Sequence, residues 1–219
     1  MKQTIGYEYS KIIPLLFEKH GYLKKYKKKH LLFGEEDSPG KCYFIKRGLV
    51  KMSQSTVEGY NVTFFLRNKR EFFGIIELIL NIPRQRYAQC LTDTILWEMD
   101  KSVFLDLIGN NPKINHLFFQ MVSNRLLLMQ KSIGNLMSKP VHWRLAWLLK
   151  QLSENEDGNK KNEITLHNLP THEEISNIIG CSRQTVSENL SNWRKMGLIN
   201  YKKKKMNIFN IENLFMSSL

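Results

Sequence analysis

Cysteine is scarce in this chain, and the few thiols are scattered. The 219 residues include three cysteines, Cys42, Cys90 and Cys181, and no Cys-x-x-Cys pair. An odd number of well-separated thiols argues against a disulfide framework, a zinc finger and an iron–sulfur cluster. We therefore expect reduced, mostly buried thiols and no metal site.

Long apolar runs and catalytic motifs are also missing. Hydrophobic residues make up 42% of the chain, but they form short stretches interrupted by charge, so no membrane-spanning segment is expected. The first residues are not followed by the apolar core of a signal peptide, and we expect a cytoplasmic protein. The sequence has no glycine-rich dinucleotide loop, Walker loop, His-Glu-x-x-His or Gly-x-Ser-x-Gly motif, so we expect that it is not an enzyme.

Acidic residues are outnumbered by basic ones. The chain has 20 Asp and Glu against 33 Lys and Arg, a formal net charge of +13. Such an excess favours a polyanionic partner, either nucleic acid or an acidic membrane surface. Codon bias toward lysine would produce the same excess, so the position of each basic cluster carries more weight than the total. The lysines of residues 24–29 are taken as a solvated surface.

The first half of the chain reads as strands and turns. Residues 42–52, 60–66 and 87–99 are rich in β-branched and aromatic side chains, with turn-forming residues between them. Several short strands of this kind predict an antiparallel sandwich or barrel. A short helix is expected to follow from residue 101, ending near Pro112.

Residues 113–138 predict one long helix without internal proline. Its apolar residues step alternately by three and four positions, the a/d seam of a parallel coiled coil, which predicts a homodimer. The alternative is a single buried helix with no partner. The seam consists of Phe119, Val122, Leu126, Met129, Ile133 and Leu136. The neighbouring apolar stripe of Phe118, Met121 and Leu128 is expected to pack on the sheet domain.

Two short helices are predicted after residue 170. Thr171 and Glu174 match the capping box that begins a helix, and Gly180 is suited to end it. The hydroxyl of Ser182 can cap the next helix. The buried stripe of that second helix is expected to consist of Val186, Leu190 and Trp193.

This arrangement predicts a helix-turn-helix, whose second helix enters the major groove of double-stranded DNA. Arg183 can donate two hydrogen bonds to guanine, Gln184 can bond adenine, and Glu188 can accept from the cytosine amino group. Alternatively, Glu188 pairs with Arg183 and orients it. The predicted DNA contacts of this region are Thr171, Ser182, Arg183, Gln184, Ser187 and Glu188.

Residues 198–211 predict a β-hairpin with a lysine-rich tip. Lysines at an exposed tip suit phosphate contact, although a run of this kind taken alone is more often a solvated loop. Its position directly after the predicted reading helix favours DNA. The predicted phosphate contacts are Lys202, Lys203, Lys204 and Lys205.

Residues 172–199 resemble the winged helix-turn-helix of the CRP/FNR transcription regulators. Residues 42–52, 72–74, 86–88 and 133–136 match the same family in order, so the resemblance covers nearly the whole chain. It implies an α+β fold: an antiparallel β-roll (jelly roll) sensor domain over 1–112, a dimerisation helix over 113–138 and a winged helix-turn-helix DNA-binding domain over 139–219. It also implies a homodimer that binds a two-fold symmetric DNA site and activates or represses transcription. We expect an activator that contacts RNA polymerase.

The effector pocket departs from the cyclic-AMP-responsive members of that family. There a Glu follows the glycine that corresponds to Gly74, and it holds the ribose hydroxyl. Here the position is Ile75, which would leave that hydroxyl unpaired at a cost of about 1–3 kcal/mol. Glu77 could replace the missing Glu only if the loop were reshaped.

Further positions of the implied pocket also differ. Arg86 matches the phosphate-binding Arg, but bulky Tyr87 follows it where the family usually has a small hydroxyl. Met129 and Gln130 match the two hydroxyl-bearing positions that contact adenine. Cyclic AMP is therefore disfavoured, and the pocket is either filled by its own side chains or takes another small-molecule effector. The candidate pocket residues are Gly74, Ile75, Glu77, Arg86, Tyr87 and Gln130.

Other cofactors are disfavoured as well, whereas one other class of function stays open. An oxygen-sensing iron–sulfur cluster needs several cysteines, mostly near the N-terminus, and none precedes Cys42. Haem is disfavoured because nothing singles out His20, His30 or His116 as an axial ligand. Cys181 reads as a buried turn residue rather than a redox switch. The alternative function is a metabolite- or nucleotide-binding sensor whose C-terminal domain contacts protein rather than DNA.

Overall fold

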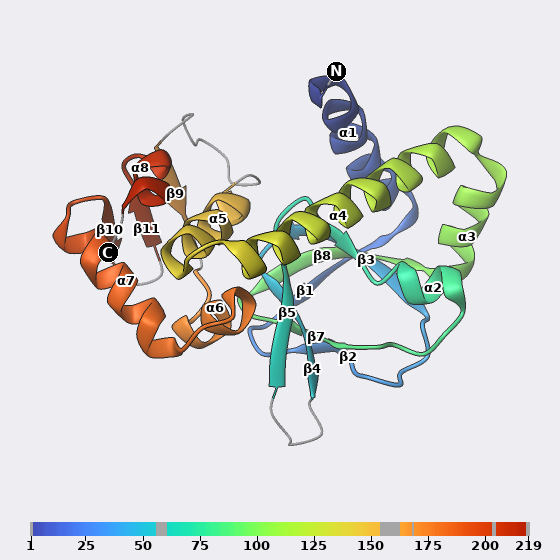
Figure 1. Ribbon diagram of the computed structural model, residues 1–219. Coiled ribbons are helices and arrows are strands. Elements are labelled where there is room, and N and C mark those ends of the chain that lie inside the picture. The colour runs from blue at the N-terminus through green and yellow to red at the C-terminus, as the bar shows by residue number, and fades with distance from the viewer. Residues whose placement is uncertain (1, 56–60, 154–162, 168, 203–204, 218–219) are drawn as a thin grey trace. The chain divides into compact units, whose positions relative to one another are not determined.

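The computed structural model describes residues 2–55, 61–153, 163–167, 169–202 and 205–217 (Figure 1). The chain divides into two compact units, residues 1–61 with 65–130 and residues 62–64 with 131–219. The division falls inside the long helix, between residues 130 and 131. No helix among the described residues is long and apolar enough to cross a membrane.

The first unit is built on two four-stranded sheets (Figure 1). One has the order β1 (Tyr22–Tyr26), β8 (Thr94–Asp100), β3 (Lys41–Arg47) and β6 (Phe72–Phe73). The other has the order β2 (Leu31–Phe33), β7 (Tyr87–Cys90), β4 (Val50–Ser55) and β5 (Asn61–Arg67). The described strand pairs are antiparallel. The predicted antiparallel β-roll and the α+β class are confirmed.

Aromatic side chains fill the interior of the roll. The ring centroids of Tyr43 and Phe73 lie 4.9 Å apart in a stacked arrangement, with Phe33 beside both. Side chains along β7 alternate between partly and fully buried, and the fully buried positions hold Ala88 and Cys90. The interior that a ligand would share is therefore already occupied by large rings on the side of β2, β3 and β6.

Helices cover the outer part of this unit: α1 (Lys2–His20), α2 (Ile76–Leu80), α3 (Lys101–Asn110) and the first half of α4 (Pro112–Ser138). The ring of Phe118 on α4 meets those of Phe72 and Phe104 edge to face, at 5.6 and 5.1 Å. Helix α1 was not predicted; it buries Ile13 and Phe17 in the same core.

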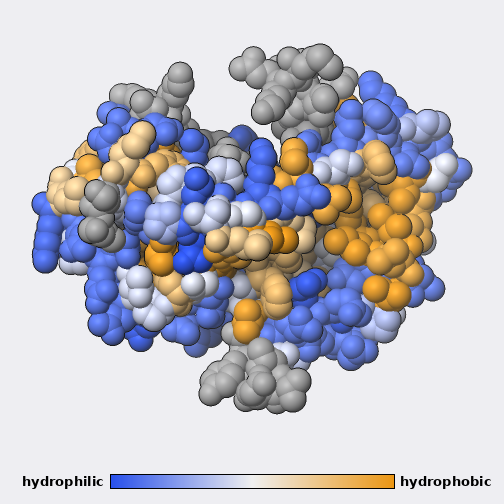
Figure 2. All heavy atoms as spheres, in the orientation of Figure 1, coloured by the Kyte–Doolittle hydropathy of each residue, from blue (hydrophilic) through white to orange (hydrophobic). Residues whose placement is uncertain are grey.

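Helix α4 begins at Pro112, a position where proline is favoured. Phe118 and Met121 of the predicted second stripe pack on the core, as expected. Leu128 does not follow them and stays 40% exposed. Another apolar group lies outside the core: the three exposed residues of α2, Ile76, Ile79 and Leu80, which contribute to the apolar surface over that helix (Figure 2).

The second unit contains the predicted helix-turn-helix and hairpin. Its elements are α5 (Val141–Ser153), β9 (Ile164–Leu166), α6 (His172–Ile179), α7 (Arg183–Lys195), β10 (Ile199–Lys202), β11 (Lys205–Ile208) and α8 (Ile211–Met216). The hairpin β10–β11 gains β9 as a third, antiparallel strand. Neither β9 nor α8 was predicted. Trp193 on α7 is fully buried, and its indole N–H donates to the Ser217 hydroxyl just after α8, at 2.7 Å.

Candidate functional site

The turn between α6 and α7 is fixed by local hydrogen bonds. The Thr171 hydroxyl accepts from the backbone N–H of Glu174, and the Glu174 carboxylate accepts from the backbone N–H of Thr171, which completes the predicted capping box. Gly180 ends α6 in the left-handed conformation, at φ +65°. Ser182 then caps α7 by accepting from the Thr185 backbone N–H at 3.0 Å. All three predicted helix boundaries are confirmed.

The two faces of α7 differ in chemistry. Val186 and Trp193 are completely buried and Leu190 nearly so, as predicted. The first turn is polar, and Arg183 and Gln184 are exposed there. A helix held by its apolar face therefore presents a guanidinium and an amide at its N-terminal end, the end that reaches base edges in a helix-turn-helix.

The remaining polar residues of this face are engaged with one another. Glu188 accepts a hydrogen bond from Gln184 at 2.8 Å, one helical turn away, so the predicted alternative in which it pairs with Arg183 is wrong. The Ser187 hydroxyl lies 2.7 Å from His172 Nδ1 and 3.1 Å from the Arg183 carbonyl oxygen. Burial, and secondarily the Arg183 charge, holds the pKa of His172 below its usual value. The predicted contacts thus include two oriented side chains, Gln184 and Ser187.

Two of the predicted phosphate contacts end the strands of the hairpin, Lys202 in β10 and Lys205 in β11. Lys202 and Lys205 face each other across β10 and β11 as the last described pair. Lys205 is exposed, while Lys203 and Lys204 lie outside the described residues. Of the predicted phosphate contacts, Lys202 and Lys205 thus lie at one end of the three-stranded sheet.

The predicted seam of α4 is exposed within the single chain. Phe119 is 69% and Leu126 56% exposed, and the other four predicted residues also leave more than a third of their surface uncovered. Apolar side chains repeating along one helix face at this level of exposure are the usual sign of a protein interface.

The predicted effector pocket divides into two parts. In the first part, Ile75 is 1% exposed and packs in the core with Phe72 and Leu78. Glu77 is buried and forms an ion pair with Arg84, at 3.3 Å from its Nη1. The Glu77 carboxylate is therefore engaged and does not replace the missing ribose acceptor.

Arg84 was not anticipated, yet it organises this part. It is 1% exposed, donates to the carbonyl oxygens of Gly74, at 2.8 Å, and of Lys41, and lies over the Phe33 ring. Gly74 has φ +75°, and an added Cβ would lie 3.0 Å from the Arg84 guanidinium. The Arg84 side chain thus connects the segment around Gly74 to strand β3.

The second part contains Arg86, Tyr87 and Gln130. Arg86 lies over the Phe65 ring, Tyr87 is half-buried on β7, and Gln130 is exposed on α4. Two further arginines that the sequence reading missed, Arg67 and Arg125, belong to this region as well. In the sequence, only their positive charge marks these two residues. Arg67 is in β5 and Arg125 is in α4, so their proximity cannot be seen from their positions in the chain.

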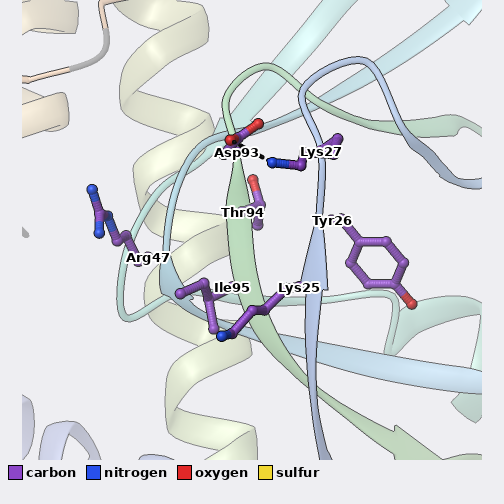
Figure 3. Close-up of a pocket in the computed structure, with 7 residues that line it drawn as sticks. All are labelled: Lys25, Tyr26, Lys27, Arg47, Asp93, Thr94 and Ile95. Carbon is purple, nitrogen blue, oxygen red and sulfur yellow. Dashed lines mark ion pairs between the residues drawn. The ribbon is translucent and has the colours of Figure 1, made fainter.

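Part of the lysine-rich segment of residues 24–29 lines a shallow groove elsewhere on the first unit (Figure 3). Lys25, Lys27 and Arg47 line it, together with Tyr26, Asp93, Thr94 and Ile95. Lys27 pairs with Asp93 at 3.6 Å, and both side chains are largely exposed. Exposed pairs of this kind contribute little energy, and the groove fits the expected solvated surface.

The three thiols are free. Cys42 and Cys90 are buried, as expected, and Cys181 is half-buried. Burial raises the pKa of Cys42 to about 12 and also raises that of Cys181, which disfavours the reactive thiolate. Among the described residues, no three His, Cys, Asp or Glu side chains come together as metal ligands.

Comparisons with known proteins agree with this architecture. The cyclic nucleotide-binding domain family matches residues 23–111, and the Crp-like helix-turn-helix domain family matches residues 144–215. A CRP-like cAMP-activated global transcriptional regulator of Mycobacterium tuberculosis is 24% identical over 185 residues, covering 84% of this chain and 83% of that protein. A global nitrogen regulator of Synechococcus elongatus is 24% identical over 190 residues, 86% of each chain.

Among solved structures, FixK2 from Bradyrhizobium japonicum shares the fold. It matches with a TM-score of 0.77 at 17% identity and covers 89% of this chain and 95% of its own. The resemblance seen in the sequence is confirmed on both halves of the chain. The chain belongs to the CRP/FNR family of transcription regulators.

Proposed function

We propose that the protein is a homodimeric regulator that binds double-stranded DNA in a sequence-specific way through α7. The observation that carries this proposal is the exposed Arg183–Gln184 pair on a helix whose opposite face is completely buried. A guanidinium donates two parallel hydrogen bonds to guanine, and an amide does the same to adenine. Glu188, bonded to Gln184, holds that amide in one orientation and reduces the entropy lost on binding.

The β10–β11 hairpin and the helix-capping residues Thr171 and Ser182 extend this surface. Lys205 and its neighbours at the hairpin tip carry positive charge suited to phosphate oxygens, which position a protein on DNA without reading sequence. The Thr171 hydroxyl and Ser182 are engaged in helix capping, so their part in DNA binding is to place α6 and α7 and to offer backbone N–H groups to phosphate.

The dimer follows from the α4 seam. Pairing of two α4 helices through Phe119, Leu126 and Ile133 would remove their exposed apolar surface from water. The two-fold axis would place two α7 helices in successive major grooves, about 34 Å apart. We propose control through the β-roll, on whose core the first half of α4 packs through Phe118, and contact with RNA polymerase in transcription activation.

Cyclic AMP is not proposed as the effector, although the mycobacterial relative is described as cAMP-activated. Ile75 offers no acceptor to a ribose hydroxyl, and Glu77 is held by Arg84. We propose no haem or iron–sulfur cluster.

Selection of binding sites from a random duplex pool, with purified protein and no added ligand, tests the proposal. A two-fold symmetric motif is expected. Arg183→Gln should weaken binding by about 1–3 kcal/mol and relax the preference at one base position. Arg194→Gln is the matched control, because Arg194 is exposed at the other end of α7; it should leave the motif unchanged. Enrichment of no motif, with protein partners captured instead, would favour a sensor that contacts protein.

A further inference from the structure

Two polar side chains on the exposed face of α7 are bonded to each other. The Gln184 amide nitrogen donates to the Glu188 carboxylate, with 2.8 Å between Nε2 and Oε1. Both residues are exposed, and they lie one helical turn apart, the spacing that brings side chains of one helix into contact. The hydrogen bond therefore lies on the surface that the proposed function assigns to DNA.

The backbone on both sides of Gln184 is held by hydrogen bonds. The Ser182 hydroxyl accepts from the Thr185 backbone N–H at 3.0 Å. The Ser187 hydroxyl donates to the Arg183 carbonyl oxygen at 3.1 Å. Because the opposite face of the helix is buried as well, the main freedom left to Gln184 lies in its own side-chain torsions.

A glutamine amide without a partner has two orientations of similar energy. The last torsion of the side chain is broad and roughly two-fold, so the carbonyl oxygen and the NH2 group exchange places at little cost. The Glu188 carboxylate only accepts hydrogen bonds, so it binds the NH2 group and excludes the orientation that turns the carbonyl oxygen of Gln184 toward it. One N–H of Gln184 is engaged in this way, while the other N–H and the carbonyl oxygen stay available.

The groups that stay available match the edge of adenine. In the major groove, adenine presents the acceptor N7 and the N6 amino donor, which pair with an N–H and a carbonyl oxygen. Guanine presents two acceptors, N7 and O6, which suit the two N–H donors of an unrestrained amide. With one donor bonded to Glu188, the carbonyl oxygen of Gln184 would face an acceptor of guanine, and neither oxygen nor base atom would gain a hydrogen bond.

We infer that Glu188 is a positioning residue that makes Gln184 select adenine and reject guanine. Its carboxylate acts through the Gln184 amide and not through a base contact of its own. A direct contact with cytosine, by contrast, would give Glu188 a base position of its own. The inference rests on the proposed function, because base selection requires that α7 binds DNA in the major groove.

Selection from a random duplex pool, repeated with variants of the full-length protein, tests the inference. Gln184→Ala identifies the base position that Gln184 reads, because the preference there should disappear. Glu188→Gln should lower the preference for adenine over guanine at that same position about 10-fold. The reason is that an amide donates as well as accepts, so it permits both orientations of Gln184. Glu188→Asp retains a group that only accepts and should retain the preference.

A role of Glu188 in helix stability alone predicts a different result. Glu188→Gln retains a hydrogen-bonding partner one turn from Gln184, so its melting temperature should stay close to that of the unchanged protein while its base preference changes. Glu212→Gln is the matched control, since it removes the same charge from an exposed side chain of the same unit. It should leave the preference at every base position unchanged.

An unchanged preference for adenine in Glu188→Gln would overturn the inference, as would an unaltered motif in Gln184→Ala. A preference that changes at a different base position would also overturn it, because Glu188 would then read a base itself. In each of these cases the enriched motif would still support the proposed function. If the unchanged protein enriched no motif at all, the proposed function would fail, and the inference would fail with it.

Discussion

The Nδ1 atom of His172, in the first turn of α6, lies 2.7 Å from the hydroxyl oxygen of Ser187 on α7. This contact joins the two helices of the helix-turn-helix, directly behind Arg183. Because burial and the Arg183 charge lower the pKa of His172 in the folded chain, the folded state favours the neutral ring. Protonation of His172 is therefore less favourable in the folded chain than in the unfolded chain.

Acid should destabilise the DNA-binding unit through this histidine. The unfolded chain takes up the proton at the ordinary pKa of about 6.5, above the folded value, so it binds more protons in the window below that pH. The contribution of His172 is complete above pH 6.5 and is lost as the pH falls through the folded pKa. Melting temperatures between pH 7.5 and 5 should fall less steeply for His172→Gln. His167→Gln, at an exposed position, should follow the unchanged protein; a parallel slope for both variants would contradict this reading.

Replacement of Gly180 should cost stability through the backbone alone. Its φ of +65° is unfavourable for residues with a side chain, whereas an added Cβ would lie 3.6 Å from Arg144 and Leu136, ordinary contact distances. Gly180→Ala is expected to lower the free energy of unfolding by about 1–2 kcal/mol. Gly180→Asn should cost less, because Asn tolerates this conformation. Urea denaturation measures both losses. If Gly180→Ala and Gly180→Asn lost equal free energy of unfolding, side-chain packing and not the positive φ would explain the need for glycine.

The buried Glu77–Arg84 pair should be sensitive to the loss of one partner. Glu77→Gln leaves the Arg84 charge buried without its carboxylate, and the expected loss is about 3 kcal/mol or more. Combining it with Arg84→Met should restore part of that stability. The exposed Lys150–Glu212 pair, at 3.1 Å, provides the comparison: Glu212→Gln should cost less than about 1 kcal/mol. Chemical denaturation of the three variants measures these losses, and similar losses for Glu77→Gln and Glu212→Gln would contradict the energy assigned to the buried pair.

Local chemistry made the helix-turn-helix predictable. Its boundaries depend on residues within four positions of one another: the Thr171–Glu174 box, the left-handed Gly180 and the Ser182 cap. The apolar period of α4 likewise lies within one helix. These features arise from hydrogen bonds and side-chain spacing that the sequence displays directly.

The features that escaped prediction depend on distant contacts. Strand β9 is three residues long and is stabilised by pairing with β11, 40 to 44 positions later in the chain. Helix α1 contains Pro14, which weakens a helical pattern, yet Ile13 and Phe17 bury it in the core. The pocket prediction depends on positions that match the family's known binding residues. Arg84 is not one of them, and its partners, such as the Lys41 carbonyl oxygen, lie far away in the sequence.

We propose that two chains pair through the α4 seam to bind DNA. Sedimentation equilibrium of the purified protein, with and without a duplex taken from the site selection, tests it most directly. Leu126→Lys places a charge in the seam at a side chain that is 56% exposed in the single chain, so folding should be preserved. Leu127→Lys is the matched control at a neighbouring position that is 49% exposed and off the seam.

The unchanged protein and Leu127→Lys should sediment at twice the 25.9 kDa chain mass and bind one symmetric duplex per dimer. Leu126→Lys should sediment as a monomer and lose most of its affinity for that duplex. A monomeric unchanged protein, or a Leu126→Lys variant that still dimerises and binds the duplex with full affinity, would contradict the account.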